Sequence, residues 1–262
     1  MNLEILFRPA ASESAKPPLL FVHGAYVGAW CWEEHFLDWF AARGYPCFAV
    51  SLRGHGGSDG RERLNDFGLA DYAEDVARAA ATLPSPPVLV GHSMGALVVQ
   101  KYLEKAEAPA VVLACPVPAY GLLPSSFSLA FSKPALFAGL NAVAGSGRAS
   151  PEALQEALFA TPPEPERAAR CYRRMQRESR RALLDMSGWN LPWQAWGGRT
   201  PPTLVLGAEH DVLIPPAQAE GAARMLHAEY RMLPGIGHAI MLDAGWESAA
   251  REILGWLEKR DL

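Results

Sequence analysis

Short, uninterrupted apolar runs alternate along this chain with segments of helical spacing. The runs are 18–22, 47–50, 88–90, 111–114 and 203–206. Runs without polar interruptions predict strands buried on both faces, as in parallel sheets. Between them, 69–80 and 246–257 repeat apolar residues at i, i+3, i+4 and i+7, which predicts helices with one packing face. The alternation predicts a doubly wound α/β fold, with a mostly parallel central sheet and helices on both faces.

Residues of roughly 120–195 interrupt this alternation. An apolar part, 121–145, is followed by a strongly charged part, 163–185, and then by closely spaced tryptophans. A solvated linker would not carry so many large apolar side chains, so we interpret the segment as a helical cap inserted into the core. The predicted core comprises residues 1–118 and 196–262, and the predicted cap comprises residues 119–195.

Composition narrows the class of protein. The 262 residues include 24 basic and 28 acidic side chains, a formal net charge of −4, and no basic run, so we expect no nucleic-acid partner. Four widely spaced cysteines lack metal-ligand or redox spacing and predict buried thiols in a reducing compartment. The N-terminal segment has no apolar signal core, so we expect a cytoplasmic protein. The cysteines are Cys31, Cys47, Cys115 and Cys171.

The segment 108–132 is free of charged residues and is long enough to cross a membrane. Four prolines interrupt it, and several serines dilute its apolar character. We therefore predict a buried strand, a turn and an apolar flap, and no stable membrane insertion. The prolines are Pro109, Pro116, Pro118 and Pro124.

Ser93 stands between two glycines where a predicted strand meets a predicted helix, in the sequence Gly91-His92-Ser93-Met94-Gly95. A serine hydroxyl is a weak nucleophile that needs a nearby base and donors for the developing oxyanion. A tight strand-to-helix turn exposes such a serine and crowds the positions two before and two after it. The pattern is typical of a nucleophile elbow, and the alternative is a plain glycine-rich turn with an idle serine.

An elbow of this kind predicts an acid and then a histidine, each after a later strand. Asp211 follows the run 203–206, and His238 follows the predicted strand 230–233. In the predicted triad Ser93 attacks, His238 carries the proton, and Asp211 orients the imidazole. Glu209 is an alternative acid that lies nearer the strand. His92 and His210 flank key residues and are interpreted as structural.

Backbone amides are predicted to form the oxyanion hole. One donor is the N–H of Met94, directly after the nucleophile. The second should come from the loop after an early strand, and we assign it to Ala25 because Gly24 allows close backbone approach. The glycine-rich stretch 53–58 lacks the Gly-Lys-Ser/Thr of a phosphate loop and predicts a structural turn that Arg53 braces.

On these motifs the chain resembles the α/β-hydrolase superfamily. The similarity covers nearly all of 17–260 and rests on FVHGAY, SLRGHGGS, VGHSMG, LVLGAEHD and GIGHAIML. The chain looks like the small capped carboxylesterases and lysophospholipase-like hydrolases, and HGAYVGAWCW is also similar to plant methyl esterases and hydroxynitrile lyases. The resemblance implies the α/β-hydrolase fold with its inserted helical cap. Many relatives have an acidic residue before Arg-Gly-x-Gly, where this chain has Ser51-Leu52.

The superfamily holds many chemistries, so fold does not choose among them. Dehalogenases and epoxide hydrolases of this fold use aspartate at the elbow, and Ser93 argues against both. No set of metal ligands is recognisable, so we expect catalysis without a cofactor. The leading hypothesis is a serine hydrolase that cleaves carboxylic esters with an apolar part through an acyl-enzyme. A C–C hydrolase, lyase or perhydrolase on the same triad, or a ligand receptor on this scaffold, stays an alternative.

The substrate pocket is predicted to lie under the cap and to be apolar. Aromatic packing between cap and core is the alternative role for each candidate. A lyase would need a further polar group in the pocket, for which Lys101, Lys105 and Lys133 are candidates. The arginine-rich stretch 167–181 is predicted to be a solvated face of the cap, and binding of an anionic head group is its alternative role. We expect a small-molecule ester as the partner, and a monomer or homodimer. The candidate pocket residues are Tyr26, Tyr120, Phe127, Phe131, Phe137, Trp189 and Trp193.

Overall fold

The computed structural model describes residues 1–12, 15–139, 150–192 and 201–262. Within them one sheet has the strand order β1-β3-β2-β4-β5-β6-β7. Strand β1 pairs antiparallel with β3, and all other neighbours pair parallel. The mostly parallel sheet predicted from the apolar runs is therefore confirmed. The strands are β1 (Ile5–Arg8), β2 (Leu19–Val22), β3 (Cys47–Val50), β4 (Val88–His92), β5 (Val111–Ala114), β6 (Thr203–Ala208) and β7 (Glu229–Leu233).

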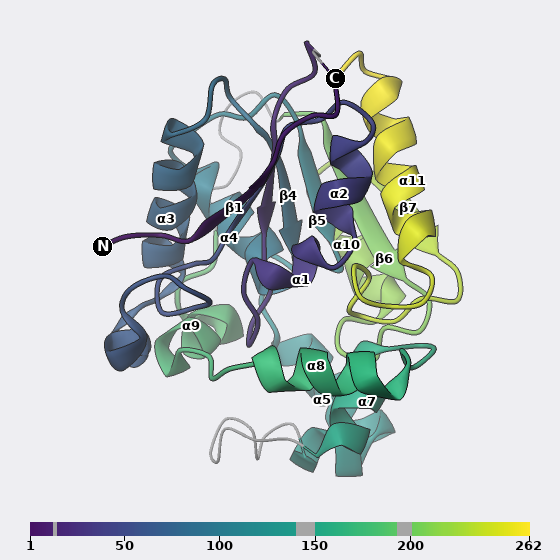
Figure 1. The fold of residues 1–262 in the computed structure, drawn as a ribbon. Coiled ribbons are helices and arrows are strands. Elements are labelled where there is room, and N and C mark those ends of the chain that lie inside the picture. Colours follow the sequence, from purple (N-terminus) through teal and green to yellow (C-terminus); the bar gives the residue numbers. More distant parts are fainter. Residues whose placement is uncertain (13–14, 140–149, 193–200) are drawn as a thin grey trace.

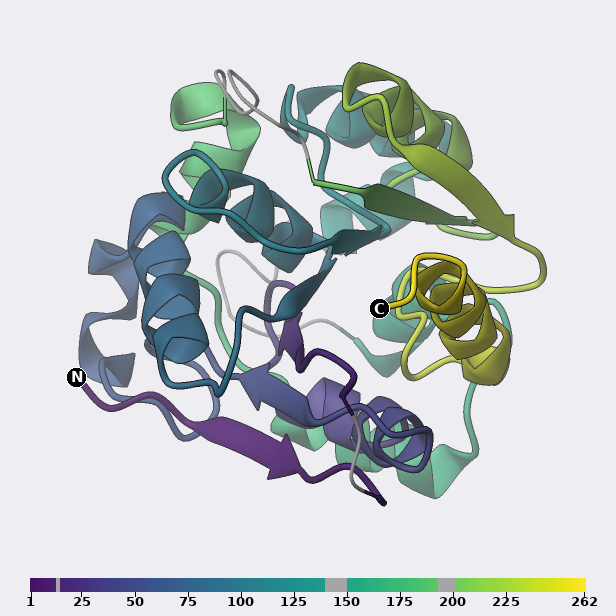
Figure 2. The same ribbon diagram turned by 90° about the horizontal axis from the view of Figure 1, so that it is seen from above.

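The central strands are buried on both faces because successive residues enter two different cores. In β2, Leu19 and Phe21 pack in one core, and Leu20 and Val22 pack in the other. Figure 2 shows the sheet between two layers of helices, and each core fills the space between the sheet and one layer. The first layer has α1 (Trp30–Glu33), α2 (Phe36–Ala41) and α11 (Trp246–Glu258), and the second has α3 (Leu69–Ala81), α4 (Met94–Tyr102) and α10 (Pro216–Met225).

A further group of helices lies beyond the carboxyl ends of the parallel strands, where α5, α7 and α8 are seen below the sheet in Figure 1. Local signals start two of them, because Ser150 and Ser179 cap the first turns of α7 and α9 through their side-chain oxygens. These helices lie in the chain between β5 and β6, so the predicted insertion of a helical cap into an α/β core is confirmed. The helices are α5 (Leu123–Ser132), α7 (Pro151–Leu158), α8 (Pro165–Arg174), α9 (Arg180–Leu184) and η2 (Asp185–Trp189).

The uncharged segment 108–132 forms β5 and a turn, as predicted, and its last part forms helix α5 where an apolar flap was predicted. Within the described residues, none of the helices combines the length and the apolarity that crossing a membrane requires. All four cysteines are buried free thiols, which agrees with the prediction from their spacing.

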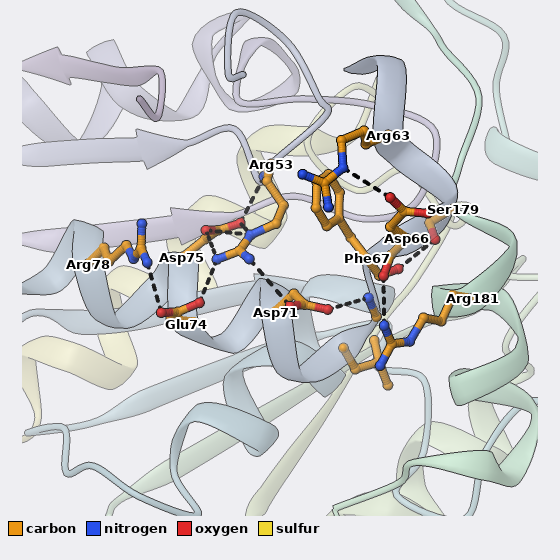
Figure 3. A network of polar contacts seen from close by, with 12 residues as sticks. Arg53, Arg63, Asp66, Phe67, Asp71, Glu74, Asp75, Arg78, Ser179 and Arg181 are labelled. Carbon is orange, nitrogen blue, oxygen red and sulfur yellow. Dashed lines mark hydrogen bonds and ion pairs between the residues drawn. The ribbon is translucent and has the colours of Figure 1, made fainter. Parts of the chain in front are cut away.

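The glycine-rich turn after β3 leads into a short helix, η1 (Arg61–Asp66), and Arg53 braces it. The backbone N–H of Arg53 donates to Oδ2 of Asp75 at 2.8 Å, and its guanidinium donates to the same carboxylate at 2.7–2.9 Å. The guanidinium also reaches Asp71 and Glu74, so one helix, α3, supplies all three carboxylates (Figure 3). The stretch 53–58 is thus a structural turn anchored to α3.

Candidate active site

Ser93 lies at the sharp turn between β4 and α4. Its φ of 52° is in the left-handed region that L-residues rarely adopt, so the turn holds it under strain. A Cβ on Gly91 would lie 2.6 Å from the carbonyl oxygen of Gly95, and a Cβ on Gly95 would meet the carbonyl oxygens of Val22 and His23. Both positions exclude any larger residue, and the turn places Ser93 at the carboxyl end of β4.

Asp211 and His238 lie in the loops after β6 and β7 and are hydrogen-bonded to each other. Nδ1 of His238 is 2.7 Å from Oδ2 of Asp211, and both side chains are buried. The other carboxylate oxygen accepts the backbone N–H groups of Leu213 and Ile214 at 2.9 and 2.8 Å. A carboxylate facing Nδ1 fixes the proton there in the neutral imidazole, which leaves Nε2 as the basic atom.

Ser93 and His238 border the same cavity, so the structure brings the predicted nucleophile and the predicted base to one space. Glu209, the alternative acid, is directed elsewhere. Its side chain is 46% exposed, and its Oε2 accepts the backbone N–H of Gly235 at 2.8 Å. The neighbouring His210 side chain is 57% exposed. The geometry therefore pairs His238 with Asp211 rather than with Glu209.

His92 supports the loop that carries His238. Its Nε2 lies 2.9 Å from the carbonyl oxygen of His238. Burial, followed by the charge of His238, lowers the pKa of His92 to about 3. The ring is consequently neutral at ordinary pH and donates Nε2–H to that carbonyl. This contact fits the structural role predicted for His92.

The loop after β2 passes directly against Ser93. A Cβ on Gly24 would lie 2.8 Å from Nδ1 of His92 and 3.2 Å from Cβ of Ser93. Ala25 and Met94 both border the same cavity as Ser93. Met94 is the first residue of α4, and the first N–H groups of a helix have no partner within it. These positions suit two oxyanion donors, and that role stays a prediction.

The cavity has a volume of about 400 Å³ and an uncharged wall. Its described lining comes from the helices between β5 and β6 and from the core, and includes no aspartate, glutamate, lysine or arginine. The wall is mainly aliphatic and aromatic, with a few hydroxyl, thiol and imidazole groups. Such a space stabilises a neutral apolar group and would desolvate a charged one without compensation.

Comparison with known proteins extends this description. Residues 19–251 match the alpha/beta hydrolase family. The chain belongs to the alpha/beta hydrolase family. Methylesterase 3 of Arabidopsis thaliana is 34% identical over 90 residues, 33% of this chain and 34% of that protein. Epoxide hydrolase 3 of Xenopus tropicalis is 36% identical over 87 residues, 33% of this chain and 23% of that protein. The chain thus matches about a third of the first protein and a quarter of the second.

A solved esterase from Thermogutta terrifontis has the same fold. It superimposes with a TM-score of 0.74 at 21% identity, covering 98% of this chain and 93% of that one. At this identity the likeness establishes the alpha/beta hydrolase fold alone.

The predicted pocket residues of this alpha/beta hydrolase divide into two groups. Tyr26 and Phe137 border the cavity. Tyr120 is half-buried but is not part of the cavity wall. Trp189 is 79% exposed on η2 and does not line the cavity either, which corrects the prediction. Trp193 lies outside the described residues.

Helix α5 explains the other two corrections. Phe127 and Phe131 are 65% and 90% exposed and lie outside the cavity wall. The residues of this segment that do line the cavity are Leu122, Ser125, Ser126 and Leu129. These follow helical spacing, so periodicity would have identified the inner face, whereas selecting the largest side chains did not.

One cluster of possible metal-ligating side chains is present among the described residues. It comprises Cys115, Asp211 and His238, whose ligand atoms lie within 4.8 Å of one another. His238 is hydrogen-bonded to the Asp211 carboxylate, and the Cys115 thiol lies close to both groups. Burial and then the Asp211 charge raise the pKa of the Cys115 thiol, so the thiol stays protonated. Sequence spacing gave no sign of this contact.

Proposed function

We propose that this protein hydrolyses neutral carboxylic esters with an apolar acyl or alcohol part, through an acyl-enzyme on Ser93. The observation that carries the proposal is the convergence of Ser93 and the His238–Asp211 pair on one uncharged cavity. Residues 119–195 would form the cap that encloses the apolar part of the substrate. The methylesterase named above supports ester chemistry in this family.

The mechanism follows from these positions. The Ser93 Oγ attacks the ester carbonyl carbon while Nε2 of His238 takes its proton, and Asp211 stabilises the imidazolium. The carbonyl oxygen becomes an oxyanion that accepts the N–H groups of Ala25 and Met94. Its collapse breaks the ester C–O bond, and His238 gives the proton to the departing alcohol. Water, deprotonated by His238, then cleaves the acyl-enzyme to release the acid and free Ser93.

The lysines considered for a lyase give that alternative no support. None of Lys101, Lys105 and Lys133 belongs to the described cavity wall. Lys101 pairs with Glu104, and Lys133 pairs with Glu156. No observation therefore places a cation where a carbanion or cyanide would need one.

Substitution of the nucleophile tests the proposal. We expect Ser93→Ala to lose turnover of p-nitrophenyl butyrate by about 10⁶-fold, as expected for a triad that works as a unit. Ser187→Ala is the matched control, because Ser187 borders the same cavity but donates its hydroxyl to the Leu183 carbonyl. Retained turnover in Ser93→Ala, or wild-type protein that neither hydrolyses esters nor takes a fluorophosphonate label, would contradict the proposal. The second outcome would favour a ligand receptor.

A chain-length series tests the substrate class. Ala157 on α7 is buried and borders the cavity, so Ala157→Phe should reduce its volume. We expect kcat/KM for octanoyl esters to fall at least 10-fold more than for acetyl esters, since a lost methylene contact is worth about 0.8 kcal/mol. Ala153→Phe on the same helix, outside the cavity wall, is the control. An equal fall for both esters would place the acyl group elsewhere.

A further inference from the structure

The fully buried carboxylate of Glu178, a cap residue, is hydrogen-bonded to the loop that lies beside Ser93. Glu178 lies between α8 and α9, and its side chain is 0% exposed. It is not part of the cavity wall and takes no part in the mechanism above. Burying a carboxylate is costly unless every oxygen is paired, so its partners indicate what it stabilises.

Four donors surround this carboxylate, two on each oxygen. Oε2 accepts the backbone N–H of Tyr26 at 3.3 Å and faces Nε2 of His55 at 3.0 Å. Oε1 accepts the hydroxyl of Tyr72 at 2.8 Å and the backbone N–H of Ser179 at 2.7 Å. Glu178 therefore joins the Tyr26 loop, the turn after β3 and helix α3.

The contact between Glu178 and His55 is an ion pair. Both ring nitrogens of His55 face acceptors, since Nδ1 lies 3.1 Å from the Arg53 carbonyl oxygen and Nε2 faces Glu178. An imidazole with two acceptors is protonated on both nitrogens. Burial opposes charge on both groups, but the charge of each partner outweighs it, so the pKa of His55 is raised and that of Glu178 is lowered.

The neighbouring His23 takes the neutral role. Its Nε2 accepts the backbone N–H of Leu52 at 3.0 Å, and its Nδ1 lies 2.8 Å from the Gly24 carbonyl oxygen. Burial and then the charge of His55 lower the pKa of His23 to about 3. The positive charge in this pair of neighbouring, mutually tilted rings therefore lies on His55, opposite Glu178.

The same cap segment holds the backbone of Tyr26 from its other side. Gln176 donates its N–H to the Tyr26 carbonyl oxygen at 2.9 Å. The Gln176 side chain also accepts from the Gly56 N–H at 3.0 Å and donates to the Gly54 carbonyl oxygen at 2.8 Å. Tyr26 has a φ of 67°, so its unfavourable backbone conformation is held by partners on both sides.

This segment is fixed rather than loosely laid over the core. Directly after Glu178, the Ser179 hydroxyl donates to the Phe67 carbonyl oxygen at 2.6 Å, and Figure 3 shows Ser179 beside Phe67. Arg181 donates to the Asp66 carbonyl oxygen at 2.7 Å. Cap residues 176–181 are therefore bonded to the core at several points around Tyr26.

We propose that Glu178 is a positioning residue for the oxyanion hole. By fixing the N–H of Tyr26 it fixes the peptide unit that follows Ala25. This restricts the backbone rotation of Ala25, whose own N–H is the proposed oxyanion donor and which borders the same cavity as Ser93. The inference rests on the proposed esterase function. It makes the cap part of the catalytic geometry as well as the wall of the pocket.

The test compares two substitutions at Glu178 with a control that removes one hydrogen bond to Oε1, the oxygen that does not contact Tyr26. Glu178→Met removes all acceptors at similar size. In Glu178→Gln, His55 loses its charged partner and becomes neutral, so its Nε2 can accept a hydrogen bond from the glutamine NH₂. This orientation points the NH₂, a donor, at the N–H of Tyr26, which then has no acceptor. Tyr72→Phe removes one donor from Oε1 and leaves Tyr26 held. Because each change can unfold some protein, kcat is expressed per active site titrated with a fluorophosphonate.

We expect both Glu178 variants to lose about 10-fold or more in kcat, with KM changed less than about 3-fold, because oxyanion donors act in the transition state. Their rate of fluorophosphonate inactivation should fall by the same factor. Tyr72→Phe should lower the melting temperature while keeping the wild-type kcat per site. Wild-type kcat in either Glu178 variant, or a Tyr72→Phe loss as large as theirs, would overturn the inference. Inactive wild-type protein would instead overturn the esterase function.

Discussion

Nδ1 of His238 lies 2.7 Å from Oδ2 of Asp211, and the same carboxylate accepts two backbone N–H groups through Oδ1. The backbone bonds prevent the carboxylate from turning, so the imidazole has one preferred orientation. The relationship identifies Asp211, rather than the nearby Glu209, as the acid that fixes the tautomer of His238.

Asp211→Asn should keep the fold and lose most activity. An amide NH₂ facing Nδ1 favours the tautomer with the proton on Nε2, which can no longer take the serine proton. We expect kcat for p-nitrophenyl butyrate to fall about 10⁴-fold, as in comparable triads. Glu209→Gln is the control, because this carboxylate is solvent-exposed and bonds only the Gly235 N–H among its described backbone contacts. A larger loss in Glu209→Gln than in Asp211→Asn would reassign the acid.

The elbow glycines should be intolerant of even one methyl group. A Cβ on Gly95 would press on the carbonyl oxygens of Val22 and His23, so β2 or α4 would have to move. We expect Gly95→Ala to lower the free energy of unfolding by about 1–3 kcal/mol, measured by urea denaturation. In Gly255→Ala, the new Cβ on α11 would meet no atom within 4 Å, and a gain of about 0.5–1 kcal/mol is expected. Equal effects of the two changes would refute the packing argument.

The sequence predicted the elements whose residues carry a local signal. Apolar runs located the strands from β2 to β6, because those strands are buried on both faces. Strand β1 was not predicted, since it lies at the sheet edge and exposes 48% of Phe7. The order of Ser93, Asp211 and His238 predicted three residues of the candidate site, because each follows a strand that ends at the same edge of the sheet.

Other features of the site depend on contacts that no local pattern encodes. Glu178 meets Tyr26 and Tyr72 across 152 and 106 residues of sequence, and in the charged stretch around it nothing distinguishes it from a solvated glutamate. The sequence likewise gives no sign that the thiol of Cys115 lies close to Asp211. The inner face of α5 is different, because the serines and leucines that line the cavity follow helical spacing and could have been predicted from the sequence.

Acid should destabilise the protein partly through His92. Its pKa is about 3 in the folded protein, through burial and then the charge of His238, against about 6.5 in an unfolded chain. Between these two pH values only the unfolded chain binds a proton at His92. The contribution of His92 to the free energy of unfolding is therefore fully present above about pH 6.5 and is lost as the pH falls toward 3. The contribution of this one group approaches about 1.4 kcal/mol per pH unit inside that window.

His92→Gln should flatten this dependence, since a glutamine amide can still donate toward the His238 carbonyl but does not titrate. We expect the free energy of unfolding of the wild type to fall faster than that of the variant between pH 6.5 and 4.5, in urea titrations at each pH. His210→Gln, at a side chain that is 57% exposed, should leave the curve parallel to wild type. Parallel curves for His92→Gln would show that His92 is charged, or solvated, in the folded state.

The buried Arg53–Asp75 pair should contribute far more to stability than the exposed pair beside it. The Arg53 side chain is 8% exposed and that of Asp75 is 0% exposed. Asp75→Ala would leave a guanidinium in the protein interior without its main partner, and we expect a loss of about 3–5 kcal/mol in the free energy of unfolding. Glu74 contacts the same guanidinium but is 51% exposed, so Glu74→Ala should cost only about 0–1 kcal/mol.

Salt separates the two cases further. Raising NaCl from 0.05 to 1 M in the measuring buffer should reduce the effect of Glu74→Ala, because the screening length falls to about 3 Å for charges in water. The effect of Asp75→Ala should persist, since solvent ions do not reach a carboxylate enclosed by Arg53 and α3. If Asp75→Ala were as mild and as salt-sensitive as Glu74→Ala, water must reach this turn, and Arg53 could not be the brace that holds it to α3.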